Sequence, residues 1–168
     1  MPQAQTKVQS ALLTTDLCAA IDAEIAKYPP EGKQSALLAA LRLAQETHGG
    51  WLSTELMDAI AGYLDLPPIA VYEVASFYTL YDLKPVGRHK IYVCTNISCM
   101  LCGSGEILDY FKKKLGVGVG ETTPDGKFTL KEVECLAACA GAPMCQIGKQ
   151  YHENLTPQKI DQILAKLD

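Results

Sequence analysis

Six of the seven cysteines in this 168-residue chain fall between residues 94 and 145. Thiolate sulfur is a preferred ligand of zinc and of iron–sulfur centres. Each of the two groups follows a run of residues that is typical of a β-strand, so each can lie on a loop at a strand end. Two such loops on neighbouring strands would bring four thiolates together, which favours an iron–sulfur site. The groups are Cys94-x4-Cys99-x2-Cys102 and Cys135-x3-Cys139, with Cys145 after them.

The composition favours a setting in which thiols stay reduced. With 48% hydrophobic residues the chain can bury a core without disulfide staples. A net charge of −4 argues against nucleic acid as a partner, and no apolar run reaches the roughly 18 residues that membrane insertion requires. The start, Met1 to Gln5, lacks the apolar segment of a signal peptide. We therefore expect a soluble intracellular protein whose clustered cysteines bind metal or do redox chemistry.

Spacing alone leaves the ligand set of a [2Fe-2S] cluster open. Cys94, Cys99 and Cys102 have the spacing of plant-type ferredoxins, with one later cysteine as the fourth ligand. The alternative is two pairs, in which Cys135 and Cys139 join Cys94 and Cys99.

Two other chemistries compete with the cluster. Cys99 and Cys102 form a C-x-x-C motif before a helix, as in thiol–disulfide oxidoreductases, although that role leaves the other cysteines unused. A structural zinc site in an interaction module would use the same thiolates.

The first half of the chain is expected to be a helical bundle over residues 14–84, after a flexible tail at 1–13. Capping residues at 14–16 and prolines at 29–30 bound the first helix. Apolar residues at helical spacing then predict helices over 33–48, from Thr54 to before Pro67, and from Pro68 to Tyr78.

The second half, 85–168, is expected to be an α/β domain that holds the cysteines. The boundary is the Lys84-Pro85-Val86-Gly87 segment. The predicted order is strand, helix, three strands and a last helix. These elements lie over 88–93, 104–115, 128–134, 144–147, 150–152 and from Pro157.

These motifs together resemble the thioredoxin-like [2Fe-2S] subunit of respiratory complex I, the 24 kDa or E subunit of NADH:quinone oxidoreductase. The resemblance covers about residues 25–165. It rests on both cysteine motifs and on further runs, among them Ala142-Pro143-Met144, Val71-Tyr72-Glu73-Val74-Ala75-Ser76-Phe77-Tyr78 and Tyr151-His152-Glu153-Asn154-Leu155-Thr156-Pro157.

The resemblance implies a fold, a ligand set and a function. The fold is an N-terminal helical bundle followed by a thioredoxin-like domain, and the ligands of one [2Fe-2S] cluster fall at Cys94, Cys99, Cys135 and Cys139. The cluster would exchange single electrons with the FMN of a neighbouring NADH-binding subunit. The chain itself would bind neither FMN nor NADH, and the isolated chain would not be catalytic. The equivalent subunit of a soluble NAD-linked hydrogenase or formate dehydrogenase is the alternative.

The resemblance also implies a place in the cell. It is the peripheral arm of the complex, among its other subunits, on the cytoplasmic side of a bacterial inner membrane.

Cysteines outside the ligand set are expected to have structural roles. Cys18 and Cys145 are predicted to be buried small hydrophobes, and Cys102 a partly buried spare thiol. The aromatic run Tyr72, Phe77, Tyr78 and Tyr81 is equally compatible with a docking surface and with an internal core.

Overall fold

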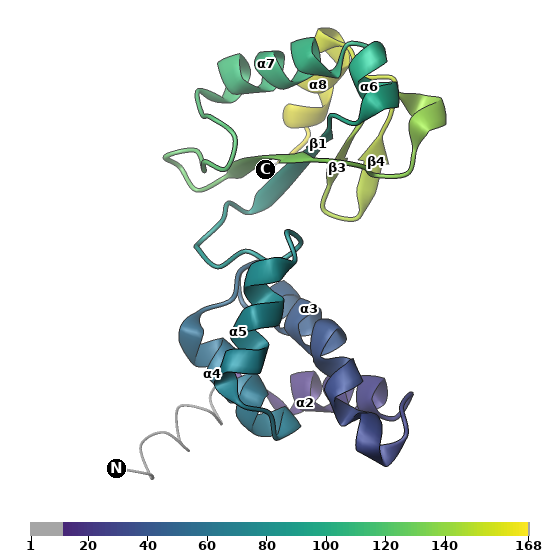
Figure 1. The fold of residues 1–168 in the computed structure, drawn as a ribbon. Coiled ribbons are helices and arrows are strands. Elements are labelled where there is room, and N and C mark those ends of the chain that lie inside the picture. The colour runs from purple at the N-terminus through teal and green to yellow at the C-terminus, as the bar shows by residue number, and fades with distance from the viewer. Residues whose placement is uncertain (1–11, 168) are drawn as a thin grey trace. The chain divides into compact units, whose positions relative to one another are not determined.

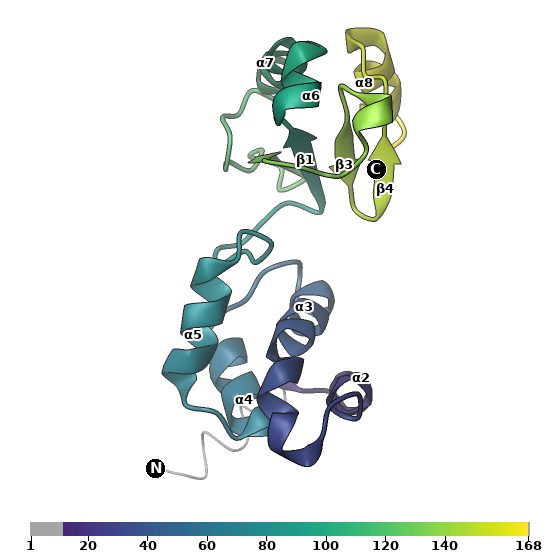
Figure 2. The same ribbon diagram turned by 45° about the vertical axis from the view of Figure 1, so that its right-hand side comes forward.

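The computed structural model describes residues 12–167, which divide into two compact units between Pro85 and Val86 (Figures 1 and 2). The expected tail lies outside the described residues except for Leu12 and Leu13, which are half-buried and pack against the helical core. Across residues 12–167 no helix has both the length and the apolar character needed to span a membrane.

The first unit is all-helical. Thr14 caps α2 by accepting a hydrogen bond from the Leu17 N–H (3.3 Å). Ser53 caps α4 in the same way through the Leu56 N–H (3.2 Å). The elements are α2 Thr15–Ile25, the 3-10 helix η1 Pro30–Ala36, α3 Leu37–Thr47, α4 Thr54–Leu64 and α5 Pro68–Phe77.

The single helix predicted over 33–48 is wrong in its first part. Residues up to Ala36 form the tighter 3-10 helix, and the α-helix begins only at Leu37. Pro30 and Gly32 stand in the first turn of this segment, and neither favours a regular α-helix. The other three predicted helices agree with the structure to within a few residues.

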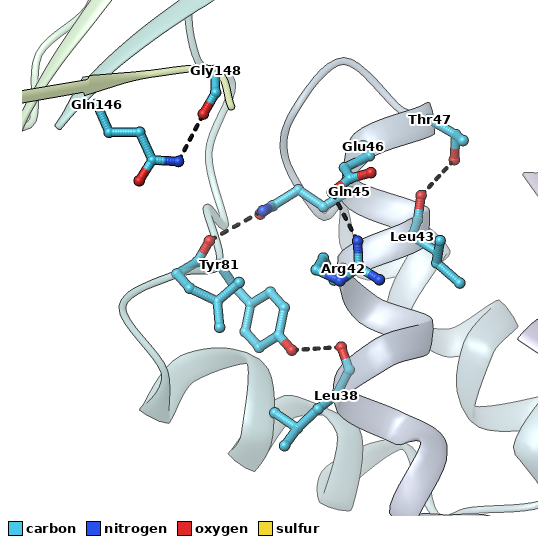
Figure 3. A network of polar contacts seen from close by, with 10 residues as sticks. Leu38, Arg42, Leu43, Gln45, Glu46, Thr47, Tyr81, Gln146 and Gly148 are labelled. Atoms are coloured by element: carbon cyan, nitrogen blue, oxygen red, sulfur yellow. Dashed lines mark hydrogen bonds and ion pairs between the residues drawn. The ribbon is translucent and has the colours of Figure 1, made fainter. Parts of the chain in front are cut away.

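Hydrogen bonds of two buried side chains, Gln45 and Tyr81, hold the segment after α5 against α3. The Gln45 side chain donates from Nε2 to the Leu80 carbonyl (3.1 Å) and accepts at Oε1 from the Asp82 N–H (2.7 Å). The Tyr81 hydroxyl donates to the Leu38 carbonyl (2.8 Å), as Figure 3 shows. Because Gln45 and Tyr81 are both buried, these bonds fix the path of the chain as it leaves the helical unit.

The second unit is a four-stranded sheet with three α-helices and one short 3-10 helix. The strands stand in the order β2-β1-β3-β4, with β1 parallel to β2 and antiparallel to β3. A parallel pair needs a crossover connection, and α7 provides it. The elements are β1 His89–Cys94, α6 Ile97–Leu101, α7 Ser104–Leu115, β2 Phe128–Val133, η2 Cys139–Gly141, β3 Cys145–Ile147, β4 Gln150–His152 and α8 Pro157–Leu164.

One face of this sheet is buried. Alternate strand residues share a core with Phe111 of α7 and Ile160 of α8, and both helices lie on the same side of the sheet (Figure 1). On the opposite face the ammonium groups of Lys90 and Lys131 lie over the Tyr92 ring. The buried strand residues are Ile91, Val93, Phe128, Leu130, Cys145 and Ile147.

Candidate metal centre

The parallel pairing of β1 and β2 brings the two cysteine segments to the same end of the sheet. Cys94, the last residue of β1, is in register with Val133, the last residue of β2. The Thr95 N–H then donates to the Val133 carbonyl (3.1 Å). Parallel strands end at the same sheet edge, so Cys135 enters its loop beside Cys94. The expectation that neighbouring strands present the two groups is confirmed.

The first cysteine segment contains a short helix that was not predicted from the sequence. Asn96 caps α6 by accepting from the Ile97 N–H (2.6 Å). The helix turns Cys99 inward, where its exposure is 2%, and leaves Cys102 exposed just past its end. In the sequence, Asn96 was the residue that could have indicated the start of this helix, because asparagine is a preferred N-cap.

The second segment is an exposed loop with one residue in the left-handed region. Ala137 has φ of 58° and donates its N–H to Cys135 Sγ (3.3 Å). Cys139 begins the short helix η2. Cys135 and Cys139 are both exposed.

An apolar cluster lies between the two segments. Cys94, Cys99 and Met144 are buried together, with Leu136 packed against them. The Cys94 N–H donates to the Met144 carbonyl (3.2 Å). Burial, followed by the hydrogen bond and charge of Cys94, raises the pKa of the Cys99 thiol to about 11. A dithiol nucleophile needs the opposite shift, which argues against a thioredoxin-type exchange role for Cys99 and Cys102.

The donor chemistry fits an iron–sulfur centre, although the four thiols do not converge. Within residues 12–167 no three His, Cys, Asp or Glu side chains stand close enough to hold a metal ion. Cys94 and Cys99 are in contact, and Cys139 is near enough to Cys99 to raise its pKa electrostatically. All four are free thiols at one sheet end, with a backbone N–H already directed at Cys135 Sγ. Soft sulfur donors of this kind, beside an apolar cluster, suit [2Fe-2S] better than a hard cation.

The three remaining cysteines differ in how far they are buried. Cys145 is buried in β3, as predicted. Cys18 is only half-buried in α2, so the prediction of a buried residue was wrong, because the helix buries Leu17 and Ile21 and Cys18 lies beside that stripe. Cys102 is exposed instead of partly buried, because α6 ends immediately before it.

The aromatic run is split between two environments. Tyr81 is buried, whereas Phe77 is 78% exposed and lies with Tyr78 beside a surface hollow of about 590 Å³ at the end of α5. Tyr81 therefore belongs to the internal core, whereas a docking surface at the exposed Phe77 and Tyr78 stays a prediction.

Residues 21–168 match the family model of the thioredoxin-like [2Fe-2S] ferredoxins. The chain belongs to that family. Among its relatives is the NADH-quinone oxidoreductase E subunit of Rickettsia bellii, which is 50% identical over 143 residues, 85% of this chain and 86% of that protein. The E subunit of Rickettsia conorii is 51% identical over the same proportions. The mitochondrial NADH dehydrogenase [ubiquinone] flavoprotein 2 of Dictyostelium discoideum is 48% identical over 85% of this chain and 58% of its own.

Solved structures agree on the fold of this family member. A chain of the NAD+-reducing [NiFe]-hydrogenase in its H2-reduced state superposes with a TM-score of 0.66 at 23% identity. The match covers 78% of this chain but only 22% of the hydrogenase chain, so it bears on the fold alone. The resemblance to the complex I E subunit and the expected fold, a helical bundle followed by a thioredoxin-like ferredoxin domain, are confirmed.

Proposed function

We propose that this chain is the electron-transfer E subunit of an NADH-quinone oxidoreductase, and that Cys94, Cys99, Cys135 and Cys139 hold its one [2Fe-2S] cluster. The observation that carries the proposal is the 50% identity over 143 residues to the E subunit of Rickettsia bellii. The placement of both cysteine segments at one sheet end supports the ligand set.

The chain's own residues would hold the cluster and set its surroundings. A bound [2Fe-2S] cluster supplies a centre that takes up and returns a single electron. The two buried thiols, Cys94 and Cys99, bind from within the fold, and Met144 beside them excludes water. The Ala137 N–H donates to Cys135 Sγ and stabilises negative charge on that sulfur. Lower solvent access and N–H donation are the means by which a protein adjusts a cluster potential.

The electron donor must lie on another subunit. We infer that this is the NADH-binding subunit with its FMN, one of several neighbours in a peripheral arm on the cytoplasmic side of the inner membrane. Exposed apolar side chains on α6 support a covering partner near the cysteines: Ile97 is 66%, Met100 58% and Leu101 78% exposed. The isolated chain is then not expected to oxidise NADH.

The ligand set is tested by single serine substitutions in the full chain. Loss of the visible absorption and of the EPR signal on reduction is expected for each of Cys94, Cys99, Cys135 and Cys139. Cys102→Ser is the matched control, because it removes an exposed neighbouring thiol. A cluster lost in Cys102→Ser but kept in Cys139→Ser would establish the plant-type arrangement instead.

Two further measurements separate the alternatives. A colourless protein with one zinc would establish the interaction module, whereas iron and labile sulfide in equal amounts support the cluster. Purification of the native assembly distinguishes an NADH-quinone oxidoreductase from a soluble hydrogenase or formate dehydrogenase, since only the first reduces quinone with NADH.

A further inference from the structure

A second concave site lies away from the cysteines, between the β3–β4 hairpin and α8. Its volume is about 430 Å³, which falls in the size range of small-molecule sites, roughly 300–1,000 Å³. Ile147, Ile163 and Leu167 provide its apolar part. The hairpin contributes Gln150 and His152, and α8 with the residues just after it contributes Lys159, Gln162 and Lys166.

The polar lining of this cavity is cationic in a chain whose net charge is −4. Of the described residues that line it, Lys159 and Lys166 are charged and none is acidic. The Glu153 side chain lies over Gly141 and is not part of the lining. Asp161, on the same helix, instead pairs with Lys114 of α7 (2.8 Å).

The fold positions these donors. Lys159 Nζ donates to the Glu153 carbonyl (2.5 Å), which holds its ammonium group beside the hairpin. His152 is half-buried, and burial together with the Lys159 charge lowers its pKa. Lys159 lines the same cavity as His152, and Cys145 is paired with His152 across the β3–β4 ladder. The Gln150 and Gln162 amides add neutral donors.

We propose that this cavity binds a small organic phosphate, with the phosphate group at Lys159, Lys166 and His152 and the organic part against Ile147, Ile163 and Leu167. Two ammonium groups and amide donors match a dianion that has several acceptor oxygens. The apolar wall matches a ligand larger than the phosphate itself. The site does not depend on the proposed cluster, because none of its lining residues is a cysteine.

Calorimetry on the full, cluster-loaded chain tests the proposal, with inorganic phosphate, pyrophosphate and AMP as probes. One saturable site is expected for pyrophosphate at low salt, with an affinity that falls as ionic strength rises. The double variant Lys159→Gln/Lys166→Gln should weaken binding at least about tenfold, since hydrogen bonds to charged groups carry this much affinity. Lys27→Gln/Lys113→Gln removes the same charge elsewhere and should bind as the wild type does.

Histidine NMR of the wild type gives a readout that needs no variant. Bound pyrophosphate favours protonated His152, so adding it should raise the midpoint of the His152 ring titration. Adding pyrophosphate should leave the titration curves of His48 and His89 unchanged. Tighter binding of AMP than of inorganic phosphate would place the organic part on the apolar wall. Absence of saturable pyrophosphate binding, or equal weakening in both double variants, would overturn the site. Unchanged cluster absorbance in all variants keeps this result separate from the proposed electron-transfer function.

Discussion

Cys145→Ser separates a packing role from a ligand role within the cysteine-rich unit. Cys145 is fully buried in β3, paired with Val93 and His152 and packed in the core beneath α7 and α8. Serine is nearly isosteric but carries a hydroxyl group into apolar surroundings. An unsatisfied buried hydroxyl costs about 1–3 kcal/mol. For a unit of this size each kcal/mol lowers Tm by about 4–8 °C.

The expected result is a large loss of stability with the cluster retained. Thermal unfolding followed by circular dichroism gives Tm, and the visible spectrum taken well below Tm reports the cluster. Cys102→Ser is the control, because its thiol is exposed and a surface change stays within about 0.5 kcal/mol. A Cys145→Ser protein with unchanged Tm, or a well-folded one without its cluster, would refute the reasoning.

The pH dependence of the same variant provides a second check. Burial raises the pKa of Cys145 to about 12 from an ordinary value of 9.0, so the folded state binds the thiol proton more tightly than the unfolded state does. The corresponding stability is complete below pH 9.0 and is lost as pH rises towards 12. The wild type should therefore lose more stability than Cys145→Ser between these values, and native Cys145 should resist alkylation at about pH 8.

Three further substitutions test the packing within each of the two units. Tyr81→Phe removes the bond to the Leu38 carbonyl and should cost about 1–2 kcal/mol in urea unfolding. Burial raises the pKa of Tyr81 to about 12 from 10.0, so the wild type loses stability as pH rises above 10.0. Tyr81→Phe should lose less unfolding free energy over that range, and the same loss in both proteins would contradict this. Gln45→Ala breaks two buried bonds and should cost more than Tyr81→Phe. Gly87→Ala places a Cβ 2.7 Å from the Phe128 backbone, so a loss of about 1–3 kcal/mol is expected, and wild-type stability would show that this strand start can shift freely.

Helices and strands were predictable from the sequence where the spacing of apolar residues matches the face that the element buries in the fold. The α7 helix has the predicted bounds, Ser104 to Leu115, because its apolar spacing matches the single face that it buries on the sheet. Each strand ends within one residue of its predicted limit, since alternate apolar residues of β1 and β2 face the core as their spacing predicts.

The details of the candidate site depended on information that periodicity does not carry. The α6 helix is five residues long, too short for a helical apolar pattern to emerge, and it was missed. Its presence determines that Cys99 is buried while Cys102 is exposed. Likewise Phe77 and Tyr81 belong to one aromatic run, yet Phe77 is exposed whereas Tyr81 is buried and donates to the Leu38 carbonyl. Such differences arise from tertiary contacts between segments far apart in the chain.

The parallel pairing of β1 with β2 imposes an order on biosynthesis. Cys139 lies 40 positions after Cys99, so at typical translation rates the second proposed ligand pair emerges about 2–8 s after the first. The two cysteine segments reach the same end of the sheet only when α7 has crossed over and β2 has paired with β1. Until then Cys94 and Cys99 are reduced thiols on a nascent strand end without the second half of their site. With the proposed ligand set, a cluster can be completed only in a chain that has made this crossover, so the visible absorbance of the protein would report that the second unit has folded.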